Sequence, residues 1–208
     1  NPGARSSLIL GLTTLWGMRL TLHLWIRWRA HGEDPRYTKI MASRMEKKGW
    51  SWAKTSLIAV FLTQAPLLFI TCLPAQLGIW ASEGGRTVIG PLGAAGAAIA
   101  LIGIAFETIG DAQLNAFRKN PDNKGKVLDT GLWRYTRHPN YFGDACTWWG
   151  IWLIAAETGL PGWISIIGPL FLTFTLTKWS GIGITEKATA KTKPGYADYV
   201  RRTSAFIP

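Results

Sequence analysis

The chain has 208 residues, of which 48% are hydrophobic and 17% are charged, and its formal net charge is +11. Soluble domains usually carry about 25% charged residues, so this composition disfavours a soluble globular protein and indicates that lipid covers much of the surface. The 12 tryptophans agree with this, because Trp concentrates at membrane–water interfaces. Cys72 and Cys146 lie in apolar stretches without metal-ligand spacing, which favours buried thiols over a metal site or a disulfide.

Five apolar stretches are candidates for membrane-spanning helices, which need about 20 mostly apolar residues. In chain order they are 7–28, 55–81, 88–110, 141–156 and 163–184. The fourth is short for a complete span. The third is rich in small residues that allow close approach between helices in lipid, namely Gly90, Gly93, Gly96 and Gly103. The sequence therefore predicts an all-α polytopic transmembrane helix bundle of about five spans, with residues 1–208 forming a single domain.

The basic residues are concentrated between the predicted spans. All 23 of them except Arg5, Arg19 and Arg86 lie in 27–54, 118–137 and 178–202. A five-span arrangement places these three segments on one side of the membrane, which the positive-inside rule assigns to the cytoplasm or its matrix or stromal equivalent. This topology explains most of the net charge, so nucleic acid is not an expected partner.

Ionisable side chains inside predicted spans usually face a partner or a cavity, because exposing them to lipid is costly. Arg19 and His23 share one face of the first helix, and a structural pairing with an acidic residue on another helix is one interpretation. Glu107 and Asp111 share a face at the end of the third span. One interpretation is an interfacial pair facing water. The other is that Asp111 and Arg118, which lie on a similar helical face, bind a polar ligand, because arginine suits a phosphate.

A dense group of polar and aromatic residues precedes the fourth span and ends at Asp144. Pro139 disfavours helical geometry in the residue before it and is tolerated in a first turn, so a new helix is expected near Asn140. The free N–H groups of such a helix start attract anions. Tyr135 and Tyr141 could stack on a ring, while Asn140 and Asp144 could bond a ribose or an amide. These residues are compatible with two interpretations, a binding site for a nucleotide-like ligand and a simple interfacial anchor, and both stay open.

Further motifs surround this segment along the chain. They are Gly32-Glu33-Asp34-Pro35-Arg36-Tyr37, Asp111 with Gln113 and Phe117-Arg118, residues 125–133, Arg137-His138-Pro139-Asn140-Tyr141-Phe142-Gly143-Asp144, and the ending from Tyr196 to Pro208. Together they resemble the steroid 5-alpha-reductase C-terminal superfamily over essentially the whole chain, and most closely its DUF1295 branch. The resemblance implies a multi-span bundle that holds NADPH near the cytoplasmic face and reduces a conjugated enone in a lipid-embedded cavity.

The resemblance also implies which residues bind the cofactor. Arg118 and Lys126 would meet phosphates, and Asn140 and Asp144 would hold the nicotinamide end or its ribose. The expected cofactor-binding residues are Asp111, Arg118, Lys126, Tyr135, Arg137, His138, Asn140, Tyr141, Asp144, Glu186 and Tyr199. No catalytic residue and no metal ligand is assigned. Asp144 stands where the steroid enzymes more usually have Glu.

Two departures from the family pattern concern catalysis. The family's substrate-activating acidic residue lies on an N-terminal span that this chain is expected to lack, and its Tyr partner aligns near Trp16. The leading hypothesis is an NADPH-dependent reductase of a steroid-like or other enone lipid, with membrane lipids and a lipophilic substrate as partners.

Two alternatives stay open. The first is an S-adenosylmethionine-dependent membrane methyltransferase, because the related isoprenylcysteine carboxyl methyltransferases share the Arg-His-Pro-x-Tyr segment. They usually carry a Glu-Glu pair where this chain has Glu186-Lys187. The second is a non-catalytic subunit that uses the fold as a scaffold and has other membrane subunits as partners.

Overall fold

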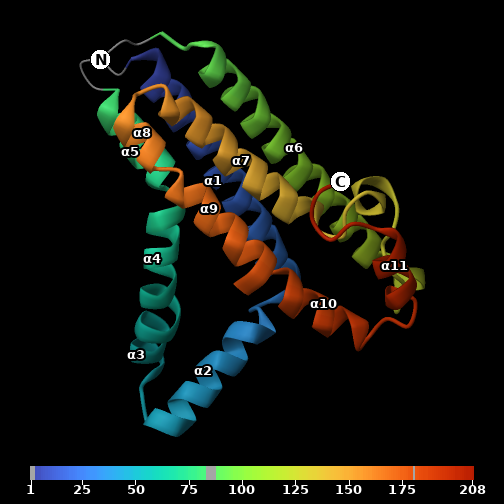
Figure 1. The fold of residues 1–208 in the computed structure, drawn as a ribbon. Helices are drawn as coiled ribbons and strands as arrows, with labels where there is room; N and C mark the ends of the chain where they lie inside the picture. Colours follow the sequence, from blue (N-terminus) through green and yellow to red (C-terminus); the bar gives the residue numbers. More distant parts are fainter. Residues whose placement is uncertain (1–2, 83–87, 180) are drawn as a thin grey trace.

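The computed structural model describes residues 3–82, 88–179 and 181–208, and these residues form a helical bundle (Figure 1). Within the described ranges no strand is formed, and Thr136 and Ser204 make an isolated β-bridge. The all-α prediction is confirmed. The helices are α1 (Ala4–His31), α2 (Pro35–Lys48), α3 (Trp52–Ser56), η1 (Leu57–Phe61), α4 (Leu62–Thr71), α5 (Leu73–Ala81), α6 (Pro91–Lys119), η2 (Pro121–Asn123), η3 (Gly131–Arg134), α7 (Pro139–Ala156), α8 (Leu160–Ile164), α9 (Ile167–Phe174), η4 (Thr175–Trp179), α10 (Ile182–Ala190) and α11 (Tyr196–Arg202).

Three helical runs in the described part of the chain are long and apolar enough to cross a membrane: Trp52–Thr71, Pro91–Lys119 and Leu160–Ala190. They correspond to the second, third and fifth predicted spans, and they support an integral membrane protein. The first and fourth predicted spans form α1 and α7, which are not among these three runs. Ser180 in the fifth predicted span and Arg86 in the short loop after the second lie outside the described residues.

The second predicted span is irregular. Residues 52–71 run continuously through α3, η1 and α4, but η1 is a π-helix, and Cys72 separates α4 from α5. Pro74 explains the break, because proline lacks the N–H that a continuing helix needs and clashes with the preceding turn. The stretch predicted as one span over 55–81 therefore forms two separate helical segments.

Helices α6 and α7 run side by side in opposite directions (Figure 1). Glycines allow their backbones to touch. A Cβ atom added at Gly103 would lie 2.5 Å from the carbonyl oxygen of Gly143, and one added at Gly96 would lie 2.5 Å from that of Gly150. Any larger side chain would push the helices apart, so the close approach predicted from the glycine pattern is confirmed.

The apolar core lies where α1 and α5 pack against the α6–α7 pair. Trp148 is completely buried and packs edge-on against Trp16 of α1, with ring centroids 5.1 Å apart. Large apolar side chains such as Phe61 and Leu62 point outward, as expected for a surface in contact with lipid. The core residues are Ile9, Leu12, Ala75, Ala100, Ile104, Trp148, Ile151, Ile154 and Ala155.

A carboxylate closes one end of the α6–α7 pair. Glu157, directly after α7, accepts hydrogen bonds from the backbone N–H groups of Gly90 (2.9 Å) and Gly93 (2.7 Å) at the start of α6. Its carboxylate also pairs with Arg5 at 3.3 Å. Burial alone would raise the pKa of Glu157, but these bonds and the charge of Arg5 hold it below the ordinary value. The negative charge satisfies N–H groups that a helix start leaves without partners.

The opposite end of the bundle carries the basic segments. Figure 1 shows α2, the end of α6, α10 and α11 toward this end, whereas the start of α1, α5 and α8 lie at the other. The three segments 27–54, 118–137 and 178–202 therefore gather at one end. The assignment of this end to the cytoplasm stays a prediction.

Candidate functional site

A buried polar cluster forms where α1 meets α6. Arg19 of α1 donates from Nη1 to Oδ2 of Asp111 at 2.8 Å and also pairs with Glu107, one turn earlier on α6. Glu107 is 3% exposed and Asp111 8%. The structural pairing predicted for Arg19 is confirmed. The interpretation of the two carboxylates as a water-facing interfacial pair is wrong, because the helix face that they share is turned toward α1.

Helix α7 contributes further side chains to this polar cluster. It begins at Pro139, as the sequence predicts, and this start places Asn140 beside α6. Asn140 Nδ2 lies 3.4 Å from Oδ1 of Asp111, and Thr147 Oγ1 donates to Oε1 of Glu107 at 3.2 Å. Both acidic residues of α6 are therefore bound from two sides, by α1 and by α7.

Asp144 joins α7 to α1 in the same region. It accepts a hydrogen bond at Oδ1 from Nε1 of Trp16 at 3.2 Å. His23 completes the cluster from α1, with its Nδ1 3.5 Å from Asp111 Oδ2. Arg19 Nε is buried and has no hydrogen-bond partner within the described ranges. The cluster thus contains one donor that a ligand oxygen could satisfy.

A second group of contacts ties the start of α7 to the C-terminal helices. Arg137 donates from Nε to Glu186 at 2.7 Å, and its Nη1 donates to the backbone carbonyls of Val200, at 3.1 Å, and Thr203. His138 Nε2 lies 3.3 Å from the same Glu186 oxygen. Burial lowers the pKa of His138 below its ordinary value, although Glu186 acts in the opposite direction.

The predicted tyrosines differ in their surroundings. The ring of Tyr141 stacks on that of His138 at 5.1 Å, and its hydroxyl lies 3.3 Å from Oγ1 of Thr185. Tyr199 is buried and donates to the backbone carbonyl of a tryptophan in η3 at 2.5 Å, and burial raises its pKa. Tyr135 is 60% exposed. One face of the Tyr141 ring is therefore already covered by the protein.

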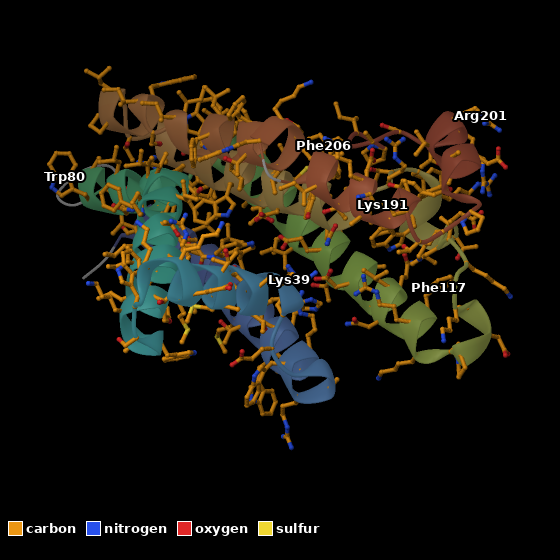
Figure 2. All side chains as sticks on the ribbon, turned by 90° about the horizontal axis from the view of Figure 1, so that it is seen from below. Lys39, Trp80, Phe117, Lys191, Arg201 and Phe206 are labelled. Carbon is orange, nitrogen blue, oxygen red and sulfur yellow. The ribbon has the colours of Figure 1, made fainter. Side chains whose placement is uncertain are left out.

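A group of cations, Arg27, Arg118 and Lys193, surrounds the end of α6, where Arg118 interacts electrostatically with Arg27, with Lys193 and with Asp111. Lys193 stands over the ring of Phe117, 5.6 Å from its centroid, and Figure 2 shows Phe117 in this region. Partial burial and then the charge of Arg118 lower the pKa of Lys193. Arg27 pairs with an aspartate, Asp34, at 2.9 Å. Arg118 makes no ion pair with any residue that the structure describes.

The predicted cofactor-binding residues separate into three sets. Asp111, Asn140 and Asp144 belong to the polar cluster, and Arg137, His138, Tyr141, Glu186 and Tyr199 to the contacts with the C-terminal helices. Arg118, at the end of α6, is exposed, and so are Lys126 and Tyr135. Sequence reasoning did not assign Trp16, Arg19, His23, Glu107 or Thr147 to the site. The four-residue spacings of Arg19 with His23 and of Glu107 with Asp111 are the signal that points to Arg19, His23 and Glu107, whereas no spacing points to Trp16 or Thr147.

Comparison with known proteins places the chain in a family. The model of a family described as a protein of unknown function, DUF1295, matches residues 1–203. The chain belongs to the DUF1295 family. This confirms the branch of the steroid 5-alpha-reductase-type superfamily that the motifs indicate.

Two curated relatives are similar to parts of this DUF1295 chain. A probable O-methyltransferase from Ustilaginoidea virens is 34% identical over 122 residues, which cover 56% of this chain and 42% of that protein. A Delta(14)-sterol reductase from Gibberella zeae is 37% identical over 90 residues, which cover 36% of this chain and 18% of that protein. The chain therefore spans less than half the length of either relative. No solved structure matches it.

Proposed function

We propose that the chain is a membrane-embedded, NADPH-dependent reductase of a steroid-like or other enone lipid. The observation that carries this proposal is the cation group of Arg27, Arg118 and Lys193 beside the polar cluster. NADPH carries several phosphate charges, and guanidinium and ammonium groups are the side chains that bind phosphate best. Arg118 has no ion-pair partner among the described residues, so a phosphate would provide one.

The donors of the polar cluster suit the other end of such a cofactor. Bound NADPH would supply a hydride to the β-carbon of a conjugated enone. Asn140 offers an amide that can pair with a carboxamide or a ribose, and Asp111 holds this side chain in place. Arg19 in turn fixes Asp111. The buried Nε–H of Arg19 is a donor for an oxygen on the substrate or the cofactor.

The surroundings of the site support a lipophilic substrate. Apolar side chains cover the outer faces of the helices, and the similarity to a sterol reductase agrees with a lipid of this class. Arg137, His138 and Glu186 would keep the C-terminal helices closed over the start of α7, since Arg137 and His138 both contact Glu186. We assign them a positioning role.

A methyltransferase is the second candidate, and two observations favour it. The match to a probable O-methyltransferase is the longer of the two alignments. The polar cluster also holds three carboxylates, Glu107, Asp111 and Asp144, which would attract the positive sulfonium of S-adenosylmethionine. The cation group at the rim argues against it, because S-adenosylmethionine has no phosphate to bind there.

The experiment that separates these functions is equilibrium binding of NADPH and of S-adenosylmethionine to the purified chain. NADPH binding without S-adenosylmethionine binding supports the reductase. The reverse result supports the methyltransferase. Binding of neither would overturn both enzyme hypotheses and favour a non-catalytic subunit.

A further inference from the structure

A second charged surface lies outside the candidate site, between α2 and the first half of the run Trp52–Thr71. It is a groove of about 630 Å³. Figure 2 shows Lys39 on α2, apart from Phe117 at the end of α6. The residues that line the groove are Lys39, Ile40, Ser43, Arg44, Lys48, Trp50, Ile58, Ala59 and Thr63.

One wall of the groove is strongly positive. Lys39, Arg44 and Lys48 all line the groove, and Arg44 and Lys48, one turn apart, share a face of α2. None of the three forms an ion pair with a residue in the described part of the chain. Lys48 Nζ lies 4.8 Å from the ring centroid of Trp50, and Lys54 approaches the same ring at 5.3 Å. These contacts hold positive charge at the mouth of the groove without neutralising it.

The other wall is apolar and belongs to a candidate membrane span. Ile58 and Ala59 lie in the π-helix η1, inside the run Trp52–Thr71. Such π-helical segments are rare and are frequent at functional sites. A hydrogen bond from Gln64 Nε2 to Tyr37 Oη, at 2.6 Å, joins α4 to α2. The groove therefore has a cationic wall on α2 and an apolar wall along the span, and this bond joins the two helices that form it.

We propose that this groove binds an anionic phospholipid, with the phosphate on Arg44 and Lys48, Lys39 adding positive charge further along the groove, and an acyl chain along Ile58 and Ala59. Charge complementarity favours an anion, since clustered Lys and Arg beside a membrane span attract anionic lipids. The apolar wall favours a lipid over a free phosphate, which would leave that wall without a partner. The site is independent of NADPH and of the reaction proposed above.

The test uses the complete chain purified in a neutral detergent and titrated with phosphatidylglycerol or with phosphatidylcholine of identical acyl chains, with bound lipid counted by native mass spectrometry. Phosphatidylglycerol should bind at least about tenfold more tightly. The triple variant Lys39→Gln, Arg44→Gln and Lys48→Gln should lose this preference, with affinity falling about fivefold for each cation removed. The matched control, Lys124→Gln, Lys187→Gln and Lys191→Gln, removes the same charge from exposed positions outside the groove and should keep it.

A second variant tests the apolar wall with all charges retained. Ala59→Phe should fill the groove and weaken phosphatidylglycerol binding, whereas inorganic phosphate in excess should not displace the lipid. The proposal is overturned if the control variant loses as much affinity as the groove variant, because general electrostatics would then explain the binding. Displacement by inorganic phosphate, or unchanged binding in both groove variants, would also contradict it.

Discussion

Arg19 of α1 donates a hydrogen bond to Asp111 of α6 at 2.8 Å, although 92 positions separate the two residues in the sequence. The same guanidinium pairs with Glu107. Charges removed from water are tolerated when they are paired and hydrogen-bonded. This pairing therefore fixes how α1 lies against α6, and it sets the position of the carboxylate that binds Asn140.

Replacing Arg19 should destabilise the protein severely. Arg19→Met would leave Glu107 and Asp111 buried without their cation, and breaking a buried pair in this way costs about 3–5 kcal/mol. Thermal or denaturant unfolding in detergent measures the loss. Arg29→Met is the matched control on the same helix, because Arg29 is exposed beside the ring of Trp25. Arg29→Met should change the free energy of unfolding by no more than about 0.5 kcal/mol. Equal losses of stability in the two variants would contradict a stabilising role of the buried pairing.

The glycine contact between α6 and α7 gives a second prediction. Gly103→Ala places a methyl group against the backbone of α7, which should lower the free energy of unfolding by about 1–3 kcal/mol. Gly11→Ala in α1 has open space around the new methyl group and should raise stability by about 0.4–1 kcal/mol. Unfolding curves of the two variants under identical conditions test this difference in sign.

Two substitutions test the proposed NADPH site directly. Arg118→Ala removes the cation assigned to a phosphate, and Asn140→Ala removes the amide held by Asp111. Arg118→Ala should weaken NADPH binding by about tenfold or more, since hydrogen bonds to charged groups contribute about 1.5–3 kcal/mol. Asn140→Ala should weaken it by about two- to tenfold, since a neutral hydrogen bond contributes about 0.5–1.5 kcal/mol. Lys47→Glu, at an exposed position on α2, should leave the affinity unchanged. Unchanged affinity in both site variants would refute this placement of the cofactor.

Lys193 predicts how NADPH binding depends on pH. Burial and the neighbouring charge of Arg118 lower its pKa from the ordinary value of 10.5. A lysine attracts phosphate only when protonated, so affinity should be full at low pH and fall as the pH rises through the lowered pKa, in a window that begins below pH 10.5. Lys193→Gln should flatten this part of the profile. A wild-type affinity that is constant up to pH 10.5 would contradict the involvement of Lys193.

The sequence predicts where the helices of this fold lie along the chain better than it predicts which helix faces pack against one another. Long apolar runs and Pro139 are local signals, so the helices and the start of α7 follow from them directly. Helical spacing also shows that Glu107 and Asp111 share a face, but not that α1 covers it. That depends on tertiary packing, which is why the water-facing interpretation failed.

The candidate site also combines local features, which the sequence predicts, with tertiary contacts, which it does not predict. The motif from Arg137 to Asp144 is contiguous, so its residues are recognisable in the sequence. The bond from Trp16 to Asp144 and the pairing of Arg137 with Glu186 join positions 128 and 49 residues apart. No local sequence pattern predicts contacts between residues so far apart in the chain, and these contacts form only when the helices pack.

The most direct test of the reductase proposal is a titration of the purified wild-type chain with NADPH and, separately, with S-adenosylmethionine, followed by calorimetry or by NADPH fluorescence. Reductase function predicts saturable NADPH binding that weakens with added salt, because the cation group holds phosphates, and no binding of S-adenosylmethionine. Saturable S-adenosylmethionine binding with no response to NADPH would contradict it.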